Sequence, residues 1–175
     1  GGALDIGAVF IDEKNDVNWA LVIRNIGTQF SSYNGVNEKL PLEIIAGVSQ
    51  ELENVPIRWH LTLENLQQWN IAFVNPSRSQ SSLDGQITDE KISFVSNALR
   101  HVSMGVELFP KRAFNLHVGY NFRRAEELRL LEQRNFSGVS LGFGLKMNKL
   151  KFNYSYSRYT LAGNTSLFGL AMNFQ

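Results

Sequence analysis

The chain of 175 residues contains no cysteine, which excludes disulfide bridges, thiol catalysis and cysteine-ligated zinc sites. Charged residues are also sparse, at 19% against about 25% in an average soluble domain. The 17 basic and 16 acidic side chains nearly cancel, so the sequence lacks the basic surface typical of nucleic-acid-binding domains. No apolar run approaches the roughly 18 residues of a transmembrane helix. The aromatic residues are plentiful (12 Phe, 5 Tyr and 3 Trp), which argues against intrinsic disorder.

The start of the chain lacks the initial Met, basic region and apolar run of a signal peptide. Gly1 and Gly2 lead directly into a segment that has the pattern of a strand. We therefore expect 1–175 to be a single domain that was processed or is the C-terminal part of a longer protein.

Alternation of apolar and polar residues with a period of two, which is typical of β-strands, dominates the sequence. The alternation predicts nine strands, at 3–11, 17–26, 41–50, 56–65, 99–109, 113–122, 138–147, 149–158 and 165–174. Their lengths are close to the roughly 9–11 residues with which a tilted strand crosses a bilayer.

The alternate positions of these segments separate into two columns of different chemistry. From residue 42 onwards the apolar column, which takes alternate positions of 42–48, 57–63, 102–108, 114–122, 139–147, 150–156 and 168–174, carries no charge and holds large side chains such as Trp59, Leu116 and Phe143. The polar column holds most of the glycines and all three histidines. The first two segments and the last are less regular, because apolar residues also fall in the polar column there: Val9, Val22, Leu167 and Ala171.

Two folds fit this alternation. In a soluble barrel or sandwich the apolar column points into a core, whereas in a membrane barrel it faces lipid and the polar column lines the lumen. The interior of a small soluble barrel usually mixes small and large residues. Here the small residues lie in the polar column, and aromatic residues gather near strand ends, as in interfacial girdles. The pattern favours an all-β, antiparallel, up-and-down transmembrane β-barrel.

The connections alternate between short and long, as in outer-membrane barrels with short periplasmic turns and long extracellular loops. This alternation predicts a periplasmic C-terminus. Nine strands do not close a bacterial barrel, which normally has an even number, so we expect other strands or a second chain to complete it. Two short helices are predicted in the long connections, one after Thr88 with apolar residues Ile92, Val95 and Leu99, and one over 125–132.

Candidate chemical groups lie in the polar column. His60, His101 and His117 share it with Arg58, Glu64, Glu107 and Lys146, and a network of paired charges in the lumen explains them better than a metal site. His101 and Ser103 share a face, but no nucleophile-elbow motif accompanies them, so we expect no enzyme, no catalytic residue and no cofactor. A channel for hydrophobic compounds stays open as an alternative.

Two clusters are candidates for binding a partner protein at the outer surface. Arg123 and Arg124 precede two glutamates, and Trp69 and Asn70 lie in an apolar stretch beyond the predicted fourth strand.

Collinear short stretches along the chain resemble the PorQ family, the FadL-like outer-membrane barrels of the type IX secretion system. The stretches are Asn25–Gln29, Leu40–Glu43, Gly47–Ser49, Pro56–Arg58, Leu66–Asn70, Arg100–His101, Gly105–Glu107, Gly119–Arg124, Glu127–Leu128, Gly138–Gly144 and Leu161–Gly163.

The resemblance implies a barrel of about fourteen strands, of which this chain supplies the C-terminal nine. It also implies a non-enzymatic role in protein secretion: anchoring a surface protein similar to PorZ beside the type IX attachment machinery. The expected surroundings are the lipid and lipopolysaccharide of the bacterial outer membrane, with no nucleic acid. A related shuttle barrel of the same system, PorV, is an alternative relative.

Overall fold

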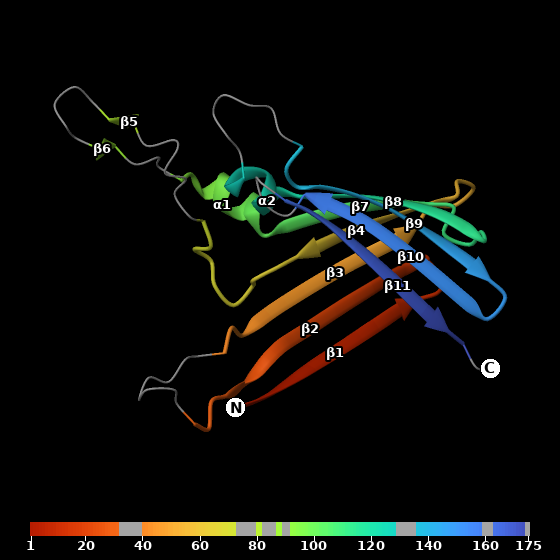
Figure 1. The fold of residues 1–175 in the computed structure, drawn as a ribbon, viewed down its shortest axis with the longest axis horizontal. Coiled ribbons are helices and arrows are strands. Elements are labelled where there is room, and N and C mark those ends of the chain that lie inside the picture. The colour runs from red at the N-terminus through yellow and green to blue at the C-terminus, as the bar shows by residue number, and fades with distance from the viewer. Residues whose placement is uncertain are drawn as a thin grey trace.

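Nine strands form one antiparallel sheet in which each strand pairs with the next of these strands along the chain (Figure 1). The computed structural model describes residues 1–31, 40–72, 80–81, 87–88, 92–128, 136–158 and 163–173. The strands of the sheet are, in order, β1 (Gly2–Asp12), β2 (Val17–Thr28), β3 (Glu43–Glu51), β4 (Ile57–Leu63), β7 (Val102–Leu108), β8 (Phe114–Asn121), β9 (Val139–Met147), β10 (Leu150–Arg158) and β11 (Asn164–Met172). The predicted meander is confirmed.

The sheet is curved but not closed into a barrel (Figure 1). In the described part of the chain, β1 pairs only with β2 and β11 pairs only with β10. A separate two-stranded sheet, β5 (Gln80–Ser81) and β6 (Ile87–Thr88), lies within the connection between β4 and β7. No helix in the described ranges is both long enough and apolar enough to span a membrane.

The short connections lie at one end of the strands and the long ones at the other (Figure 1). Asp16, Asn54 and Asn148 lie in three of the short turns with positive φ angles of 51°, 64° and 50°. Asp and Asn adopt this left-handed conformation more readily than other residues with side chains, which suits them to tight turns. We call the two ends of the sheet the short-turn end and the long-loop end.

Two short helices, α1 (Phe94–Arg100) and α2 (Phe122–Glu127), contact each other at the long-loop end. The prediction that a strand begins at residue 99 is wrong, because α1 continues to Arg100 and β7 starts at Val102. The helix predicted after Thr88 begins only at Phe94, with Ser93 as its N-cap, since the Ser93 hydroxyl accepts the Ser96 N–H at 3.2 Å.

The second helix begins earlier than the sequence pattern predicted. Asn121 ends β8 and caps α2, because its Oδ1 accepts the Arg124 N–H at 2.8 Å. This cap starts the helix at Phe122 instead of Ala125, and residues 129–132 of the predicted helix lie outside the described part.

The register places the two columns on opposite faces of the sheet, as predicted. Arg58 is paired with Glu107, and Glu107 with His117, on one face. Val106 is paired with Val118, and Val118 with Leu141, on the other face. We call these the inner and outer face, because the sheet curves around the polar one: Glu107 and Asn115 are only 7% exposed, whereas Leu141 is 52% exposed.

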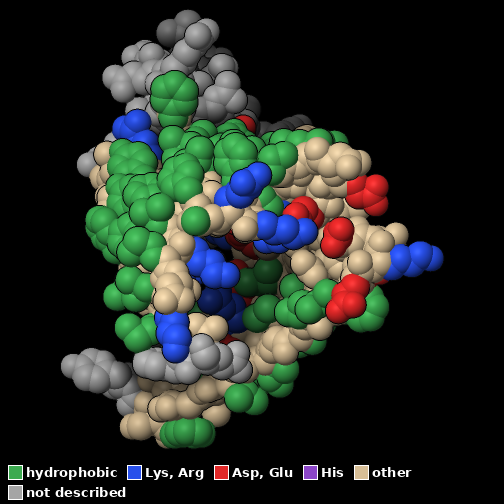
Figure 2. All heavy atoms as spheres, turned by 90° about the vertical axis from the view of Figure 1, so that its right-hand side faces the viewer, with side chains coloured by type: hydrophobic (Ala, Val, Ile, Leu, Met, Phe, Trp, Pro, Cys, Tyr) green, Lys and Arg blue, Asp and Glu red, His purple; other side chains and the backbone are tan. Residues whose placement is uncertain are grey.

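The burial of this sheet is the inverse of that in a soluble domain. Ile71 is the single buried hydrophobic residue in the described ranges, and the other buried side chains are polar: Asn97, Arg100, His101, Glu107, Asn115 and Ser137. Figure 2, which faces the short-turn end, shows a hollow with Lys and Arg side chains around it and hydrophobic side chains along the outer side of the arc. In the described ranges the sheet thus encloses its polar face and leaves its apolar face exposed.

Candidate functional site

The inner face carries a polar network centred on Glu107 of β7. Its Oε2 lies 3.2 Å from Nη1 of Arg58 and 3.8 Å from Nε2 of His60. Its Oε1 accepts a hydrogen bond of 2.9 Å from the side-chain amide of Asn115. Three side chains of the flanking strands β4 and β8 thus share one carboxylate.

This network extends to the short-turn end through Glu51, the last residue of β3. Glu51 accepts from Nη2 of Arg58 at 3.0 Å and from Nζ of Lys111 at 2.8 Å. The hydrogen bond from Lys111, which lies in the turn between β7 and β8, raises the pKa of that ammonium group above its usual range. The predicted network of paired charges therefore includes Arg58 and Glu107, with the His60 ring beside them, and it extends to Glu51 and Lys111.

Towards the long-loop end, the inner face has a second chain of hydrogen bonds. Ser103 donates to Oε1 of Glu64 at 2.8 Å and accepts from the side-chain amide of Asn121 at 2.7 Å. Asn121 in turn caps α2. These hydrogen bonds therefore connect Glu64, the residue after β4, through β7 and β8 to the start of α2.

Ser103 and His101, the pair considered for nucleophilic catalysis, contact other groups rather than each other. Within the described ranges, no group of three or more His, Asp or Glu side chains is arranged to hold a metal ion. The Ser103 hydroxyl bonds Glu64, and the His101 ring faces backbone oxygens instead of Ser103.

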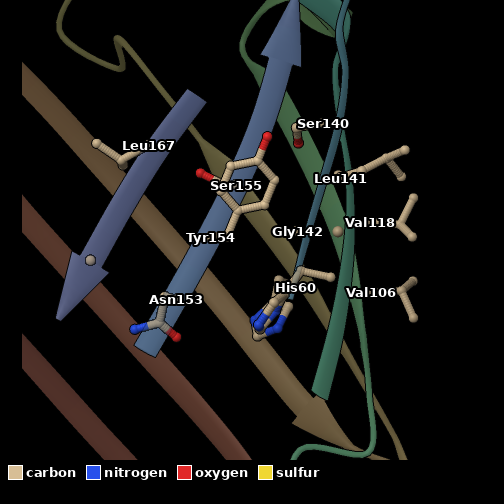
Figure 3. Close-up of a pocket in the computed structure, with 14 residues that line it drawn as sticks. His60, Val106, Val118, Ser140, Leu141, Gly142, Asn153, Tyr154, Ser155 and Leu167 are labelled. Carbon is tan, nitrogen blue, oxygen red and sulfur yellow. The ribbon is translucent and has the colours of Figure 1, made fainter. Parts of the chain in front are cut away.

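A hollow of about 480 Å³ lies on the inner face between β4 and β11 (Figure 3). Small and polar residues make most of its wall, including His60, Gly105, His117, Gly119, Ser140, Gly142, Asn153 and Ser155. Figure 3 shows Val106, Val118 and Leu141 pointing away from His60, to the opposite face of the sheet.

Trp69, one of the predicted partner-binding residues, is held in a defined position beside α1. Its ring stacks on His101 at a centroid distance of 5.4 Å and lies 4.8 Å from the Phe94 ring. Nδ1 and Nε2 of His101 lie 2.7 and 3.0 Å from the backbone oxygens of Glu64 and Trp69. The side-chain amide of Asn97 also donates to the Trp69 carbonyl. Three polar contacts therefore fix the connection that carries Trp69.

Helix α1 buries its polar side and exposes its apolar side. Asn97 and Arg100 are buried, whereas Phe94 and Val95 are 72% and 64% exposed. Leu66, Trp69 and Leu99 are also exposed hydrophobic residues of this region. We call Leu66, Trp69, Phe94, Val95 and Leu99 the apolar patch. Of these five, Trp69 and Phe94 are in ring contact, and exposed apolar side chains gathered at one end of a molecule are typical of interaction sites.

Arg123 and Arg124, the other predicted partner-binding residues, lie at the start of α2 and line a polar pocket of about 480 Å³. Glu43, Glu64, Asn65, Asn121, Glu127 and Leu128 complete the wall. Arg123 forms an ion pair of 2.8 Å with Glu127. In the described part of the chain this pocket does not include Trp69 or Asn70, so the two predicted clusters form separate features.

Sequence reasoning did not identify Phe94, Asn97 or His101 as supports of Trp69. The spacing of Val95 and Leu99 predicted a helix, and helical spacing would normally place such residues against the protein. The sequence signal for the buried side of the helix was the polar pair Asn97 and Arg100. These residues are three apart and lie on the side opposite the exposed apolar residues.

We predict that His101→Phe loosens this region while keeping an aromatic ring under Trp69. The variant loses both ring contacts to backbone oxygens, which should lower the local free energy of opening by about 1–3 kcal/mol. Hydrogen exchange of the Glu64 amide, which donates to the His101 carbonyl at 2.8 Å, measures this change. Val95→Ala, an exposed change in the same helix, should leave that exchange rate unaltered; equal rates in both variants would contradict the role of His101.

Comparison with known proteins finds no matching protein-family model, no matching curated protein and no matching solved structure.

Proposed function

We propose that this sheet is part of the wall of an outer-membrane β-barrel and that its outer face lies against lipid. The observation that carries the proposal is the distribution of charge. On the outer face of the paired strands, the charged residues are Asp12 and Arg158, which end β1 and β10 at opposite ends of the sheet. An uncharged band between two charged ends is the pattern that a bilayer requires of a spanning strand.

The open edges of the sheet support closure by further strands. β1 and β11 each have one unpaired side in the described part, and an unpaired backbone group in hydrocarbon costs several kcal/mol. The resemblance to the PorQ family implies about fourteen strands, an even number as in other bacterial barrels.

The lengths of the connections support an orientation. Outer-membrane barrels keep their short turns in the periplasm and their long loops outside the cell. In that orientation the chain leaves β11 on the periplasmic side, and the apolar patch and the pocket of Arg123 and Arg124 lie at the cell surface.

The role that we propose is non-enzymatic anchoring of a surface protein, as in the type IX secretion system that the resemblance implies. The apolar patch supports this role, because its residues are exposed although Asn97 and His101 contact the Trp69 carbonyl and hold that residue in place. A fixed, exposed aromatic surface is suited to bind a partner at small entropic cost. The partner is expected to resemble PorZ and to lie beside the attachment machinery.

We predict that the double variant Trp69→Ala with Phe94→Ala releases this surface protein from the outer membrane. Loss of two aromatic contacts at an interface should weaken binding at least tenfold, since one such hot spot is worth about 2 kcal/mol. The amount of the PorZ-like protein in the membrane fraction and in the medium is measured by immunoblotting. Phe30→Ala, an exposed phenylalanine outside the apolar patch, is the control. Retention of the partner by the double variant would refute the assignment.

The second candidate function is a FadL-like channel for hydrophobic compounds. It is favoured by apolar residues on the inner face near both edges of the sheet, where Val9, Ile11 and Leu167 are exposed. Uptake of a hydrophobic compound by liposomes that contain the full-length protein, unaffected by the Trp69 and Phe94 changes, would favour the channel over the anchor.

A further inference from the structure

The outer face has an apolar groove at its long-loop end, over β9 to β11. The groove has a volume of about 600 Å³ and is lined by Phe136, Val139, Leu141, Tyr156, Arg158, Gly163 and Asn164. Leu141 and Tyr156 are register partners on neighbouring strands, so they form one continuous apolar floor. The volume is within the range of small-molecule and cofactor sites.

One end of the groove is polar. Arg158 is the last residue of β10 and is paired with Asn164, the first residue of β11. Arg158 is the single positively charged residue on the outer face of the paired strands, and its side chain is half-buried beside Tyr156. A guanidinium and a carboxamide therefore both line the groove where the apolar floor ends.

We propose that this groove binds a phosphate-bearing membrane lipid, with an acyl chain over Leu141 and Val139 and the phosphate at Arg158. This inference rests on the proposed function, because it needs the outer face to lie in lipid. We choose a lipid as the ligand of the groove because its polarity and charge match those of the groove. The apolar floor suits an acyl chain, and the positive group at its end suits an anion at the depth of the lipid headgroups.

The chemistry of the two polar residues fits a phosphate. The planar guanidinium of an arginine donates two parallel hydrogen bonds to phosphate oxygens, and it stays charged at every physiological pH. The Asn164 amide nitrogen is a further donor for a third oxygen. Tyr156, beside them, has the amphipathic ring that is enriched at membrane interfaces.

The test is native mass spectrometry of the full-length protein in detergent, titrated with three probes. Dioleoyl phosphatidic acid carries chains and phosphate, dioleoylglycerol carries the chains alone, and inorganic phosphate carries the anion alone. We expect retention of phosphatidic acid only. Arg158→Gln should weaken it about tenfold, as expected for the loss of one charge-assisted contact. Arg112→Gln, the same change in the turn between β7 and β8, should leave binding unaltered.

Equal binding of dioleoylglycerol, displacement of the lipid by inorganic phosphate, or unchanged binding by Arg158→Gln would each overturn the site. The comparison of the three probes on the wild-type protein decides the question even if Arg158→Gln does not fold. A protein that stays monodisperse without detergent would instead refute the proposed membrane function itself. A membrane-embedded protein whose lipid binding ignores Arg158 would refute the site alone.

Discussion

Arginine in place of Leu116 or Phe143 is expected to destabilise the protein by about 2–4 kcal/mol, the cost of an arginine on the lipid face near the middle of a bilayer. Phe143 is at the centre of β9 and is paired with Leu116 of β8. Its ring is also 5.5–6.3 Å from those of Phe114, Phe152 and Tyr154, so its replacement removes aromatic contacts as well. Urea unfolding of the full-length protein in lipid vesicles measures the change.

The matched control is Ser155→Arg, on the inner face of β10. Ser155 is exposed and is paired with Gly142 and Leu167, which leaves room for a longer side chain in the hollow. Its free energy of unfolding should change by less than about 0.5 kcal/mol. Similar losses in all three variants would show that the faces are wrongly assigned.

The alternation by itself would suggest Asn115→Arg as a further inner-face control, but the structure excludes it. Asn115 belongs to the polar column, yet it is buried, donates to Glu107 and lies so close to Gly144 that a Cβ there would collide with its Oδ1. Arginine at 115 is therefore expected to be harmful for reasons unrelated to lipid. Position in a column predicts the face of a residue but not the space around it.

The second large effect is expected from Glu107→Ala on the inner face. The change removes the acceptor of Asn115 and one of the two carboxylates that hold Arg58, in a site where Glu107 is 7% exposed. Loss of one partner of an enclosed ion pair leaves the other poorly solvated. Since Arg58 keeps its contact with Glu51, we expect the free energy of unfolding to fall by about 2–3 kcal/mol.

Two comparisons make this prediction specific. Glu107→Gln keeps an oxygen that can accept from Asn115 and should lose less than the alanine variant does. Glu53→Ala, in the short turn between β3 and β4, removes an exposed carboxylate and should change stability by less than about 0.5 kcal/mol. Both are measured by the same urea unfolding. If Glu53→Ala and Glu107→Ala lost equal stability, the network would have no structural role.

Sequence reasoning located the strands well and the helices poorly. β9 and β10 agree with the predicted segments to within one residue at each end, because alternation with a period of two is a local property of extended backbone. The start of β7 was misplaced because Leu99 continues an apolar pattern that fits both a helix and a strand. Only the Ser93 cap and the contact between α1 and α2 select the helix.

The candidate site was found in part for the same physical reason. Trp69 stood out as an exposed aromatic residue in a connection, but its supports are distant in the sequence: Asn97 is 28 residues away and His101 is 32. Arg123 and Arg124 stood out as a charged run, and the structure adds Glu43 of β3 and Glu64, which follows β4, to their pocket. Contacts between distant segments leave no local signal in a single sequence.

The sequence by itself determined the strands, their order along the meander and the division into a polar and an apolar face, because each depends on neighbours along the chain. Only the tertiary structure decided which face is enclosed. Alternation is identical whether a sheet curves towards its apolar or its polar side, and here it curves around Glu107 and Asn115. That curvature leaves Leu141 and its neighbours exposed, and it is the physical basis for placing them against lipid.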